Sequence, residues 1–384
     1  MKLLDITHFY SDKSGGIKTY INNKIEYFKN KDIEHVLIVP GKKDNINYKD
    51  NINYINHSKI YQIKSPYMLV WKQYRLLVNH KKIANIIQYE KPDIVEIGSL
   101  FLLPSFIKKL KEKLNFRMIG FFHSNLEKSL SNILKLNKED SVVSKMTRKY
   151  IYKAYSDMDL IIAPSFYVKD YLNTLGLYNV EVVYHGIDVG FFENQAPDKE
   201  LQNALKDKIV LIYVGRFSKD KNFLELLDIF KTVYSLDNRF HLILVGDGPD
   251  KKHINKILDR GFTVFDYIKD KKTLAGLYKA SDIFVSASKS DTFGYSIIEA
   301  QACGLPVVAY KDVSFPEIVY YKNYLASSKE EFIKNLLILS KTYQHLDKSQ
   351  IKGFVKERFS LEKNMEELFF IYKSLSGLYQ KRFA

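Results

Sequence analysis

Short apolar segments alternate with amphipathic segments along most of the chain. In the first half the apolar segments are KLLDI (2–6), EHVLIV (34–39), DIVEIG (93–98), RMIGFF (117–122), LIIAPS (160–165) and VEVVYH (180–185). In the second half they are KIVLIYV (208–214), FHLILVG (240–246), FTVFDY (262–267), DIFVSA (282–287) and PVVAY (306–310). These segments predict buried strands, while 221–236 and 272–282 have helical periodicity. The alternation predicts an α/β fold with parallel sheets wound by right-handed crossovers.

This alternation breaks between Gly186 and Lys208, where polar residues and a proline interrupt it. We place a linker at 188–207, between an N-terminal domain (1–187) and a C-terminal domain (208–360), because 384 residues exceed one ordinary core. Two Rossmann-like domains with parallel sheets facing a central cleft are the expected architecture, and ligands favour such clefts. The tail, 361–384, contains an amphipathic helical pattern that packs either on its own domain or on the first.

Composition and charge limit the cellular compartment and the kinds of partner that we expect. The first residues, MKLLDITHFY, do not resemble a signal peptide, and no apolar stretch has the length of a membrane span. The single Cys permits a reducing compartment. We therefore expect a cytoplasmic protein. The net charge of +15 reflects either a composition rich in Lys or attraction to an anionic partner. Zinc-ligand spacing, RNP-like aromatic patterns and basic heptads are lacking, which argues against a nucleic-acid partner.

Three segments of the first half mix Lys and Arg with apolar residues at helical spacing. They are WKQYRLLVNHKKIANII (71–87), FIKKLKEKLNFR (106–117) and SKMTRKYIYKAY (144–155). Each is either an ordinary amphipathic helix with a solvated Lys face or an interfacial helix. On a chain of this charge, the three together favour peripheral contact with an anionic membrane, on the inner face of the cytoplasmic membrane.

Two acids follow the strand at 282–287, in SKSDTFGYSIIEAQACGLP (288–306). Asp291 lies in the loop between this strand and the next helix, which begins after Gly294 and breaks at Gly304-Leu305-Pro306, and Glu299 lies one to two turns into that helix. In an open parallel sheet, such loops lie at the carboxyl ends of the strands, where ligands bind. This stretch therefore predicts a site for a polar ligand.

Two cations occupy an equivalent loop in VGRFSKDKN (214–222). Arg216 and Lys221 follow a predicted strand, and a guanidinium with an ammonium at this spacing can clamp a diphosphate. The alternative is a pair of solvated surface cations. VGDGP (245–249) is a further glycine-rich strand exit, which serves either as a plain turn or as a ligand contact.

The first domain has its own candidates at strand ends. Gly15 and Gly16, in SGGIKTY, open a predicted helix and would let an anion approach the backbone closely. His123, in FFHSN, ends a predicted strand at the ligand edge, and is either functional or structural. His8 also follows a strand, without further support.

Two other features are better explained as structural. Asp157-Met158-Asp159 is a D-x-D pattern of the kind that holds a divalent metal in some sugar-nucleotide enzymes, but it precedes the strand at 160–165 and so lies at the amino end, away from the predicted cleft. Cys303 has no His or acid placed to activate it and is expected to pack within its helix.

Together these motifs resemble the family 4 retaining glycosyltransferases (group 1 glycosyltransferases), which have the two-domain GT-B fold. The resemblance covers nearly the whole chain. It is carried by SGGIKTY, the His of FFHSN, YHGID, VGRFSKDKN, VGDGP and, above all, DTFGYSIIEAQACGLPVVAY, which is similar to the family's signature of two acids separated by seven residues. The opening segment is similar to mannosyl- and glucosyltransferases that act on lipid-linked or surface glycans.

This resemblance implies α-retaining transfer of a hexose from a nucleoside-diphosphate sugar, of the GDP-mannose or UDP-glucose type, to a hydroxyl of a glycan or glycolipid, with neither a metal ion nor another cofactor. The implied catalytic residues are His123, Arg216, Lys221 and Asp291. The implied donor-binding residues are Gly15, Gly16, Arg216, Lys221, Ile268, Asp291, Thr292, Phe293, Gly294, Tyr295 and Glu299, with Glu299 on the ribose.

The sequence departs from the family pattern in three places. The first acid of the signature is Asp291 where Glu is commoner, Asp266 takes the place of a Gly in FDYIKD, and the Gly pair often found before PEIV is missing. Three alternatives remain. These are a sugar-nucleotide-binding partner of another transferase that does not turn over, a GT-B nucleotide-sugar epimerase, and a hydrolase with two carboxylates, which leaves the Arg, Lys and Gly residues unexplained.

Overall fold

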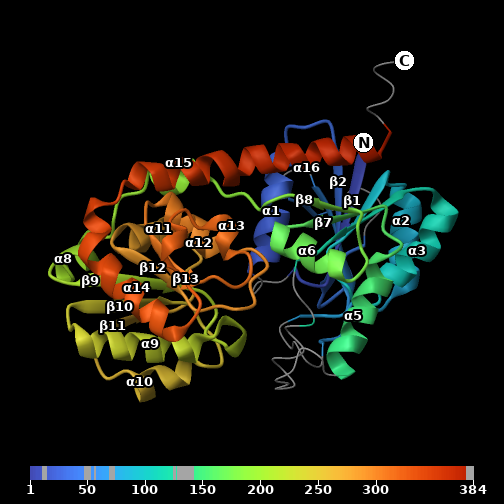
Figure 1. Cartoon of the computed structure of the whole chain (residues 1–384). Coiled ribbons are helices and arrows are strands. Elements are labelled where there is room, and N and C mark those ends of the chain that lie inside the picture. The colour runs from blue at the N-terminus through green and yellow to red at the C-terminus, as the bar shows by residue number, and fades with distance from the viewer. Residues whose placement is uncertain are drawn as a thin grey trace. The chain divides into compact units, whose positions relative to one another are not determined.

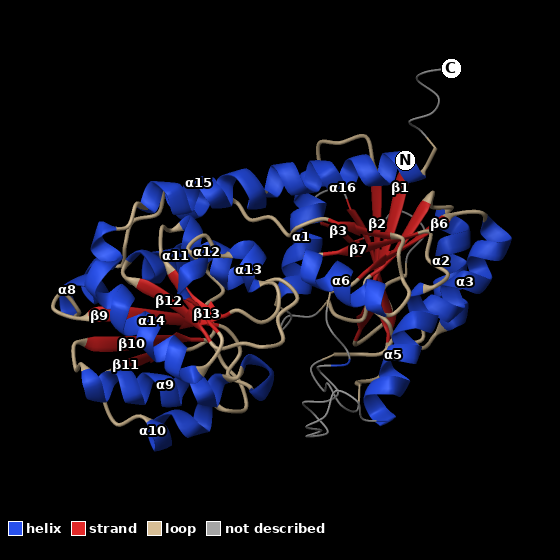
Figure 2. Ribbon diagram, viewed as in Figure 1, coloured by secondary structure: helices blue, strands red, loops and turns tan. Residues whose placement is uncertain are grey.

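The computed structural model describes residues 1–10, 15–46, 53–55, 58–68, 74–123, 127 and 142–377. The chain divides into two compact units. Unit 1 contains the described residues of Met1–Ser124, Asp140–Val183 and Glu362–Ala384, and unit 2 contains those of Asn125–Glu139 and Tyr184–Leu361. Each unit is a β-sheet flanked by helices, as Figures 1 and 2 show.

The sheet of unit 1 has the strand order β3-β4-β2-β1-β5-β6-β7-β8 among the described residues. All neighbours pair in parallel except β3, which runs antiparallel to β4. Leu4 of β1 lies opposite Val36 of β2 on one side and Val95 of β5 on the other. The strands are β1 (Lys2–Ile6), β2 (Glu34–Gly41), β3 (Asn53–Ile55), β4 (Ser58–Lys64), β5 (Ile94–Ile97), β6 (Arg117–Phe121), β7 (Leu160–Ala163) and β8 (Val180–Val182).

The helices of unit 1 each bury one apolar stripe. In α2 the stripe is Ile83, Ile86 and Ile87, all without exposed surface, and the side chain of Asn79 caps the helix. The last helix, α16, belongs to unit 1 although the rest of that unit lies before residue 184. The helices are α1 (Gly16–Phe28), α2 (His80–Glu90), α3 (Leu103–Leu114), α5 (Val142–Tyr155), α6 (Phe166–Thr174) and α16 (Leu361–Leu375).

The sheet of unit 2 is parallel throughout, in the order β11-β10-β9-β12-β13-β14. Its strands are β9 (Ile209–Val214), β10 (Phe240–Val245), β11 (Phe262–Phe265), β12 (Ile283–Ser286), β13 (Val307–Tyr310) and β14 (Leu325–Ala326). Its helices are α7 (Val189–Glu193), α8 (Lys199–Ala204), α9 (Phe223–Leu236), α10 (Ile254–Ile257), α11 (Lys271–Lys279), α12 (Tyr295–Ala302), α13 (Phe315–Ile318), α14 (Lys329–Thr342) and α15 (Lys348–Phe359). Side chains of α9 and α14 form one core with alternate residues of the strands.

The chain crosses from one unit to the other near Ile187 and near Leu361. These two crossing segments are hydrogen-bonded to each other within unit 2. The amide of Ile187 donates to the carbonyl of Phe359 at 2.9 Å, and the amide of Leu361 donates to the carbonyl of Ile187 at 2.9 Å. The segment 188–207 carries α7 and α8 and is part of unit 2. Among the described residues, no helix has both the length and the apolar character needed to cross a bilayer.

Candidate functional site

The candidate residues of unit 2 gather where the strand order reverses. From β9 the chain adds β10 and β11 on one side and β12, β13 and β14 on the other. The loops that leave the carboxyl ends of β9 and β12 therefore meet at a topological switch point, the usual ligand position in such sheets. The loops are directly bonded, because the hydroxyl of Ser290 donates to the carbonyl of Asp220.

Arg216, Lys221 and Asp291 are brought together at this point. Lys221 ends a short 3₁₀ turn (Lys219–Lys221) and forms an ion pair with Asp291. Arg216 is half exposed, pairs with Asp220 at 2.9 Å, and has its carbonyl held by the hydroxyl of Tyr213 at 2.9 Å. Two cations from the loop after β9 thus face an acid from the loop after β12.

The environment keeps Asp291 ionised. Burial alone would raise the pKa of this carboxyl, but the charge and hydrogen bond of Lys221, together with Ser288 and Arg216, outweigh burial and hold the pKa below its usual value. Although Asp is one methylene shorter than the commoner Glu, it reaches Lys221. The acid and the cation therefore hold each other in place before any ligand arrives.

The glycine-rich exit of β10 supports the same loop. Gly246 has a φ of 147°, and a Cβ there would lie 2.0 Å from the carbonyl oxygen of Gly215, so a larger residue does not fit. The amide of Phe217 donates to the carbonyl of Asp247 at 2.9 Å. VGDGP thus fixes the backbone on which Arg216 is mounted.

The loop from Asp291 to Gly294 leads directly into α12. Gly294 has a φ of 120°, and a Cβ there would lie 2.9 Å from Cδ1 of Ile318. The hydroxyl of Ser314 donates to the carbonyl of Phe293 at 2.6 Å. Thr292 is half-buried between Asp291 and Phe293, and the helix starts at Tyr295. The first backbone N–H groups of α12 therefore lie at the same strand end as Asp291.

An aromatic cluster packs against the loop from Asp291 to Gly294 and positions it. The ring of Phe293 lies 5.1 Å from His185 and 5.8 Å from Phe359, which belong to the two crossing segments described above. His185 also stacks on Tyr295 at 5.0 Å. Burial lowers the pKa of His185 to about 3, so the ring is neutral. YHGID contributes to the resemblance to the family, but its residue pattern gives no signal for this packing role.

Glu299 has a different environment from Asp291. It is half-buried on α12, and the hydroxyl of Tyr278 from α11 donates to its Oε2 at 3.1 Å. Burial raises the pKa of Glu299 to about 7, although Tyr278 and Lys271 lower it. Sequence reasoning missed Tyr278, because it occupies an ordinary apolar position of an amphipathic helix.

Ile268 follows β11, at the far edge strand of this sheet, and is half-buried. Its neighbour Asp266, which replaces the Gly of the family pattern, is exposed and pairs with Lys251. This loop therefore presents an apolar side chain beside an ion pair.

The candidates of unit 1 also lie at a switch point, between β1 and β5. Gly15 and Gly16 are exposed at the start of α1, while Ser14 falls outside the described residues. His123, two residues after β6, is half-buried and stacks on Phe121 with ring centroids 4.2 Å apart. A Cβ on Gly98, just after β5, would lie 3.5 Å from Cδ2 of His123, so the ends of β5 and β6 meet here.

The remaining sequence candidates are His8, Asp157, Asp159 and Cys303, of which His8 lies at the same sheet edge, two residues after β1. His8 is buried, with Nδ1 2.6 Å from the hydroxyl of Ser99, and burial lowers its pKa to about 3. Asp157 pairs with Lys108 at 2.7 Å, and Asp159 pairs with Lys111 at 2.6 Å. Cys303 is buried.

Two family profiles match the chain, one for each half. "Glycosyl transferases group 1" matches residues 194–348, and "Glycosyltransferase Family 4" matches residues 14–191. The first match contains Arg216, Lys221, Asp291 and Glu299, and the second contains Gly15, Gly16 and His123.

Characterised relatives match over most of their length. The alpha-monoglucosyldiacylglycerol synthase of Acholeplasma laidlawii is 25% identical, over 69% of this chain and 71% of its own. A GDP-mannose-dependent alpha-(1-6)-phosphatidylinositol dimannoside mannosyltransferase of Mycobacterium tuberculosis is 21% identical, over 83% of this chain and 82% of its own.

Among solved structures, HepE of Anabaena, crystallised in complex with UDP, shares the fold. It has a TM-score of 0.73 and 16% identity, and the match covers 97% of this chain and 100% of that one. The parallel sheets, the two profile matches and this shared fold confirm the prediction of two α/β domains built on parallel sheets. The chain belongs to the group 1 glycosyltransferases of family 4, and it is a transferase enzyme of the GT-B fold.

Proposed function

We propose that this transferase moves a hexose from a nucleoside-diphosphate sugar, of the GDP-mannose or UDP-glucose type, to a hydroxyl of a glycan or glycolipid, with retention of configuration and without a metal ion. The observation that carries the proposal is the cluster of Arg216, Lys221 and Asp291 at the switch point of unit 2. A glycosyl transfer needs positive charge on the leaving diphosphate and an acceptor of hydrogen bonds on the sugar.

The leaving group defines the role of the cations. As the anomeric bond breaks, negative charge grows on the diphosphate, and fixed donors aimed at that charge lower the barrier. Arg216 offers a planar fork and Lys221 a single ammonium, from two sides of one loop. The N-terminus of α12 adds backbone donors at the same strand end.

The two acids hold the rest of the donor. Asp291, kept ionised by Lys221, accepts hydrogen bonds from sugar hydroxyls together with the backbone of Thr292 and Gly294. Glu299 binds the ribose diol, as a carboxylate does in dinucleotide sites. Ile268 packs against the base, and Tyr295 starts the helix that carries Glu299.

Unit 1 supplies the acceptor side. In this proposal His123 has a role toward the sugar, and the backbone at Gly15 and Gly16 has a role toward the diphosphate. The relatives from Acholeplasma and Mycobacterium are named for glycolipid products and acceptors, which supports a lipid-linked or surface glycan as the acceptor here.

A donor screen tests this function. The purified chain is incubated with a panel of UDP- and GDP-hexoses, with and without EDTA, and release of the nucleoside diphosphate is followed. We expect slow hydrolysis of sugars on one of the two nucleotides, unaffected by EDTA and faster with a glycan or glycolipid acceptor. Conversion of the donor into an isomeric nucleotide sugar would indicate an epimerase, and binding without turnover would indicate a non-catalytic partner.

Replacing Glu299 by Gln should mainly weaken donor binding. The amide removes the charge that the ribose hydroxyls meet, so we expect the KM for the donor to rise roughly tenfold, with a smaller change in kcat. Glu225→Gln is the matched control, because Glu225 also accepts a hydrogen bond from a tyrosine hydroxyl, that of Tyr310. An unchanged donor KM in Glu299→Gln would show that Glu299 is only a helix residue.

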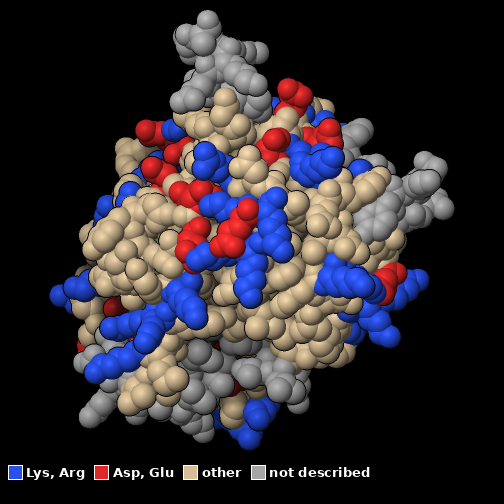
Figure 3. Space-filling model, turned by 90° about the vertical axis from the view of Figure 1, so that its right-hand side faces the viewer, with Lys and Arg blue, Asp and Glu red and all other residues tan. Residues whose placement is uncertain are grey.

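Membrane contact is proposed through α5, which is the best suited of the three basic helices. The isoleucines of α2 are buried, and in α3 Lys108 and Lys111 pair with the aspartates described above. On α5, by contrast, Val142 and Met146 are 73% and 68% exposed. Figure 3 shows that Lys and Arg side chains are spread widely over the viewed face of the molecule.

The exposed face of α5 combines two stripes. Val142, Met146 and Tyr150 recur every four residues, and Lys145, Lys149 and Lys153 form a parallel exposed stripe beside them. The helix contains no acidic residue. A stripe of cations beside exposed apolar side chains matches an anionic lipid surface.

Reversing the three lysines of α5 to Glu should abolish this contact. At about 1 kcal/mol per Lys, we expect at least a 10²-fold loss of partitioning onto anionic vesicles in co-sedimentation. Lys231, Lys334 and Lys341, exposed lysines on helices of unit 2, receive the same change as a control for net charge. Binding that ignores lipid charge and salt, or that falls equally in both triple variants, would rule out α5 as the membrane-binding surface.

A further inference from the structure

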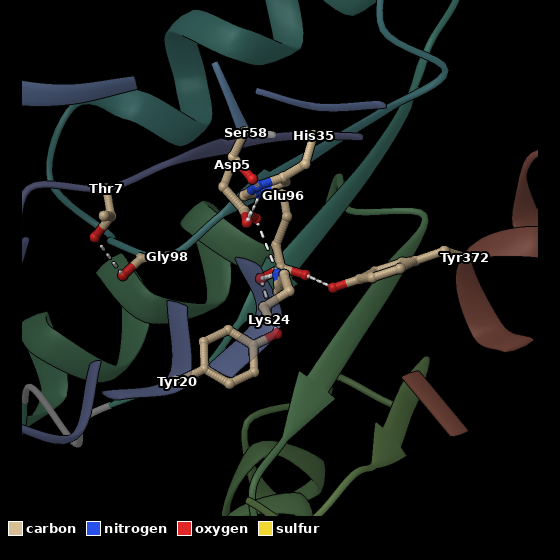
Figure 4. Close-up of polar contacts among 9 residues, drawn as sticks. All are labelled: Asp5, Thr7, Tyr20, Lys24, His35, Ser58, Glu96, Gly98 and Tyr372. Carbon is tan, nitrogen blue, oxygen red and sulfur yellow. Dashed lines mark hydrogen bonds and ion pairs between the residues drawn. The ribbon is translucent and has the colours of Figure 1, made fainter. Parts of the chain in front are cut away.

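A fully buried lysine, Lys24, belongs to α1. Figure 4 shows Lys24 between the carboxylates of Asp5 and Glu96, with Nζ at 3.0 Å from the first and 2.7 Å from the second. Nε2 of His35 lies 2.7 Å from Asp5, and Nδ1 of the same ring lies 2.8 Å from Ser58. The residues come from β1, β2, β4, β5 and α1.

The cluster does not itself perform chemistry. Ser58, His35 and Asp5 are hydrogen-bonded in the order that a hydrolase triad uses, but all three are buried, and Asp5 is engaged by Lys24. Because no substrate can reach the hydroxyl of Ser58, this arrangement is part of the core. The proposed transfer reaction uses none of these residues. Their role is therefore to position the side chains that they contact.

Glu96 connects the cluster to the end of the chain. Its Oε1 accepts from the hydroxyl of Tyr20 at 3.1 Å, and its Oε2 accepts from the hydroxyl of Tyr372 on α16. The ring of Tyr372 also lies 6.3 Å from Phe28 of α1. The last helix thus reaches a carboxylate that is separated from it by 276 residues.

Tyr20 connects the cluster to the candidate site. Its ring lies 5.0 Å from that of His123, edge to face, and 4.4 Å from Phe121, on which His123 stacks. One side of the imidazole is therefore fixed by a ring whose hydroxyl is held by Glu96.

We propose that Tyr372 and Glu96 are positioning residues for His123. The helix α16 holds Glu96, and Glu96 in turn holds Tyr20 against the imidazole. The C-terminal helix is by this account a structural part of the acceptor-side site. The role of His123 rests on the proposed function, whereas the position of its ring does not.

The charge of Glu96 determines how strongly this carboxylate holds the hydroxyl of Tyr20. Two residues of α1, Lys24 and Tyr20, and one residue of α16, Tyr372, are hydrogen-bonded to Glu96. Asp5 of β1 also faces Glu96, and His35 of β2 is hydrogen-bonded to Asp5. Burial raises the pKa of Glu96 to about 6, Asp5 adds to the rise, and Lys24 and the Tyr372 hydroxyl oppose it. Loss of that hydroxyl raises the pKa further, so more of Glu96 becomes protonated near neutral pH. A neutral acid is a weaker acceptor for Tyr20 than a carboxylate.

The test compares Tyr372→Phe with Tyr61→Phe in the full chain. Each change removes one tyrosine hydroxyl from a buried glutamate of unit 1, since Tyr61 donates to Glu90. Only the first glutamate is linked to His123. Ring signals of labelled histidine are followed by NMR as pH is varied, with His123→Asn identifying the signal among the nine histidines. Glu96→Gln is a second variant, which cannot ionise.

In Tyr372→Phe we expect the His123 signal to move near neutral pH and to return toward wild type at alkaline pH. In Glu96→Gln it should be displaced at every pH, and in Tyr61→Phe it should stay in place. We also expect a roughly tenfold lower kcat in Tyr372→Phe with an unchanged donor KM, because the change leaves Arg216, Lys221 and Glu299 of unit 2 in place.

Unmoved His123 signals in folded Tyr372→Phe and Glu96→Gln would overturn the proposal, as would an equal displacement in Tyr61→Phe. If the wild-type chain turns over no sugar nucleotide, the proposed function fails, and the NMR comparison alone decides this inference.

Discussion

Arg216→Ala is expected to lower the rate of sugar transfer by about 10²-fold or more, with the fold intact. Arg216 is half exposed, so its loss leaves no buried cavity, but it removes a fixed cation from the position where charge develops on the leaving diphosphate. The measurement is kcat/KM for the donor identified by the screen, together with a thermal melt.

Arg239→Ala is the matched control for this prediction. Arg239 is also an exposed arginine of unit 2 that pairs with a neighbouring aspartate, Asp237, at 2.7 Å. It directly precedes β10 and therefore lies at the amino end of the sheet, away from the switch point. Full activity in Arg216→Ala, or an equal loss in Arg239→Ala, would contradict the assignment of the diphosphate to this loop.

Lys24→Met is expected to lower the free energy of unfolding by about 3–5 kcal/mol. The change keeps an apolar chain of similar length but leaves Asp5 and Glu96 buried without their shared cation, and breaking a buried pair in this way is strongly destabilising. Lys24 keeps the pKa of Asp5 at about 2, against burial, so the variant must also protonate or reorganise this pair. Urea unfolding followed by circular dichroism measures the difference.

Lys2→Met is the comparison for Lys24→Met. Lys2 also bridges two acids, Glu34 and Glu90, each at 3.0 Å, but it is partly exposed. We expect a cost of about 1 kcal/mol, as for pairs that water screens. If the two variants were equally stable, the buried cluster would not be a major support of unit 1.

The alternation of strands and helices could be predicted because parallel strands buried on both faces are continuously apolar. Each of the eleven expected segments overlaps a strand of the structure. The strand β4 was missed, because Lys59 and Gln62 interrupt its apolar run, although Tyr61 and Ile63 are fully buried. Its partner β3 and the two-residue β14 are too short to give a periodic signal.

The candidate site could be predicted only where residue type and strand-end position agree. Arg216, Lys221 and Asp291 satisfy both conditions, and their ion pair follows from the meeting of two loops. Lys24 could not be predicted, because in a sequence it resembles any lysine on the polar side of a helix. Its partners come from two strands and define its role only in three dimensions.

The most direct test of the account is calorimetric binding of UDP and of GDP, combined with hydrogen exchange to locate the site. We expect one of the two nucleotides to bind and to protect residues 214–222 and 290–299. We expect Arg216→Ala to lose this binding and Arg239→Ala to keep it. Equal binding by wild type and Arg216→Ala, or protection confined to other segments, would contradict the claim that this loop pair holds the donor.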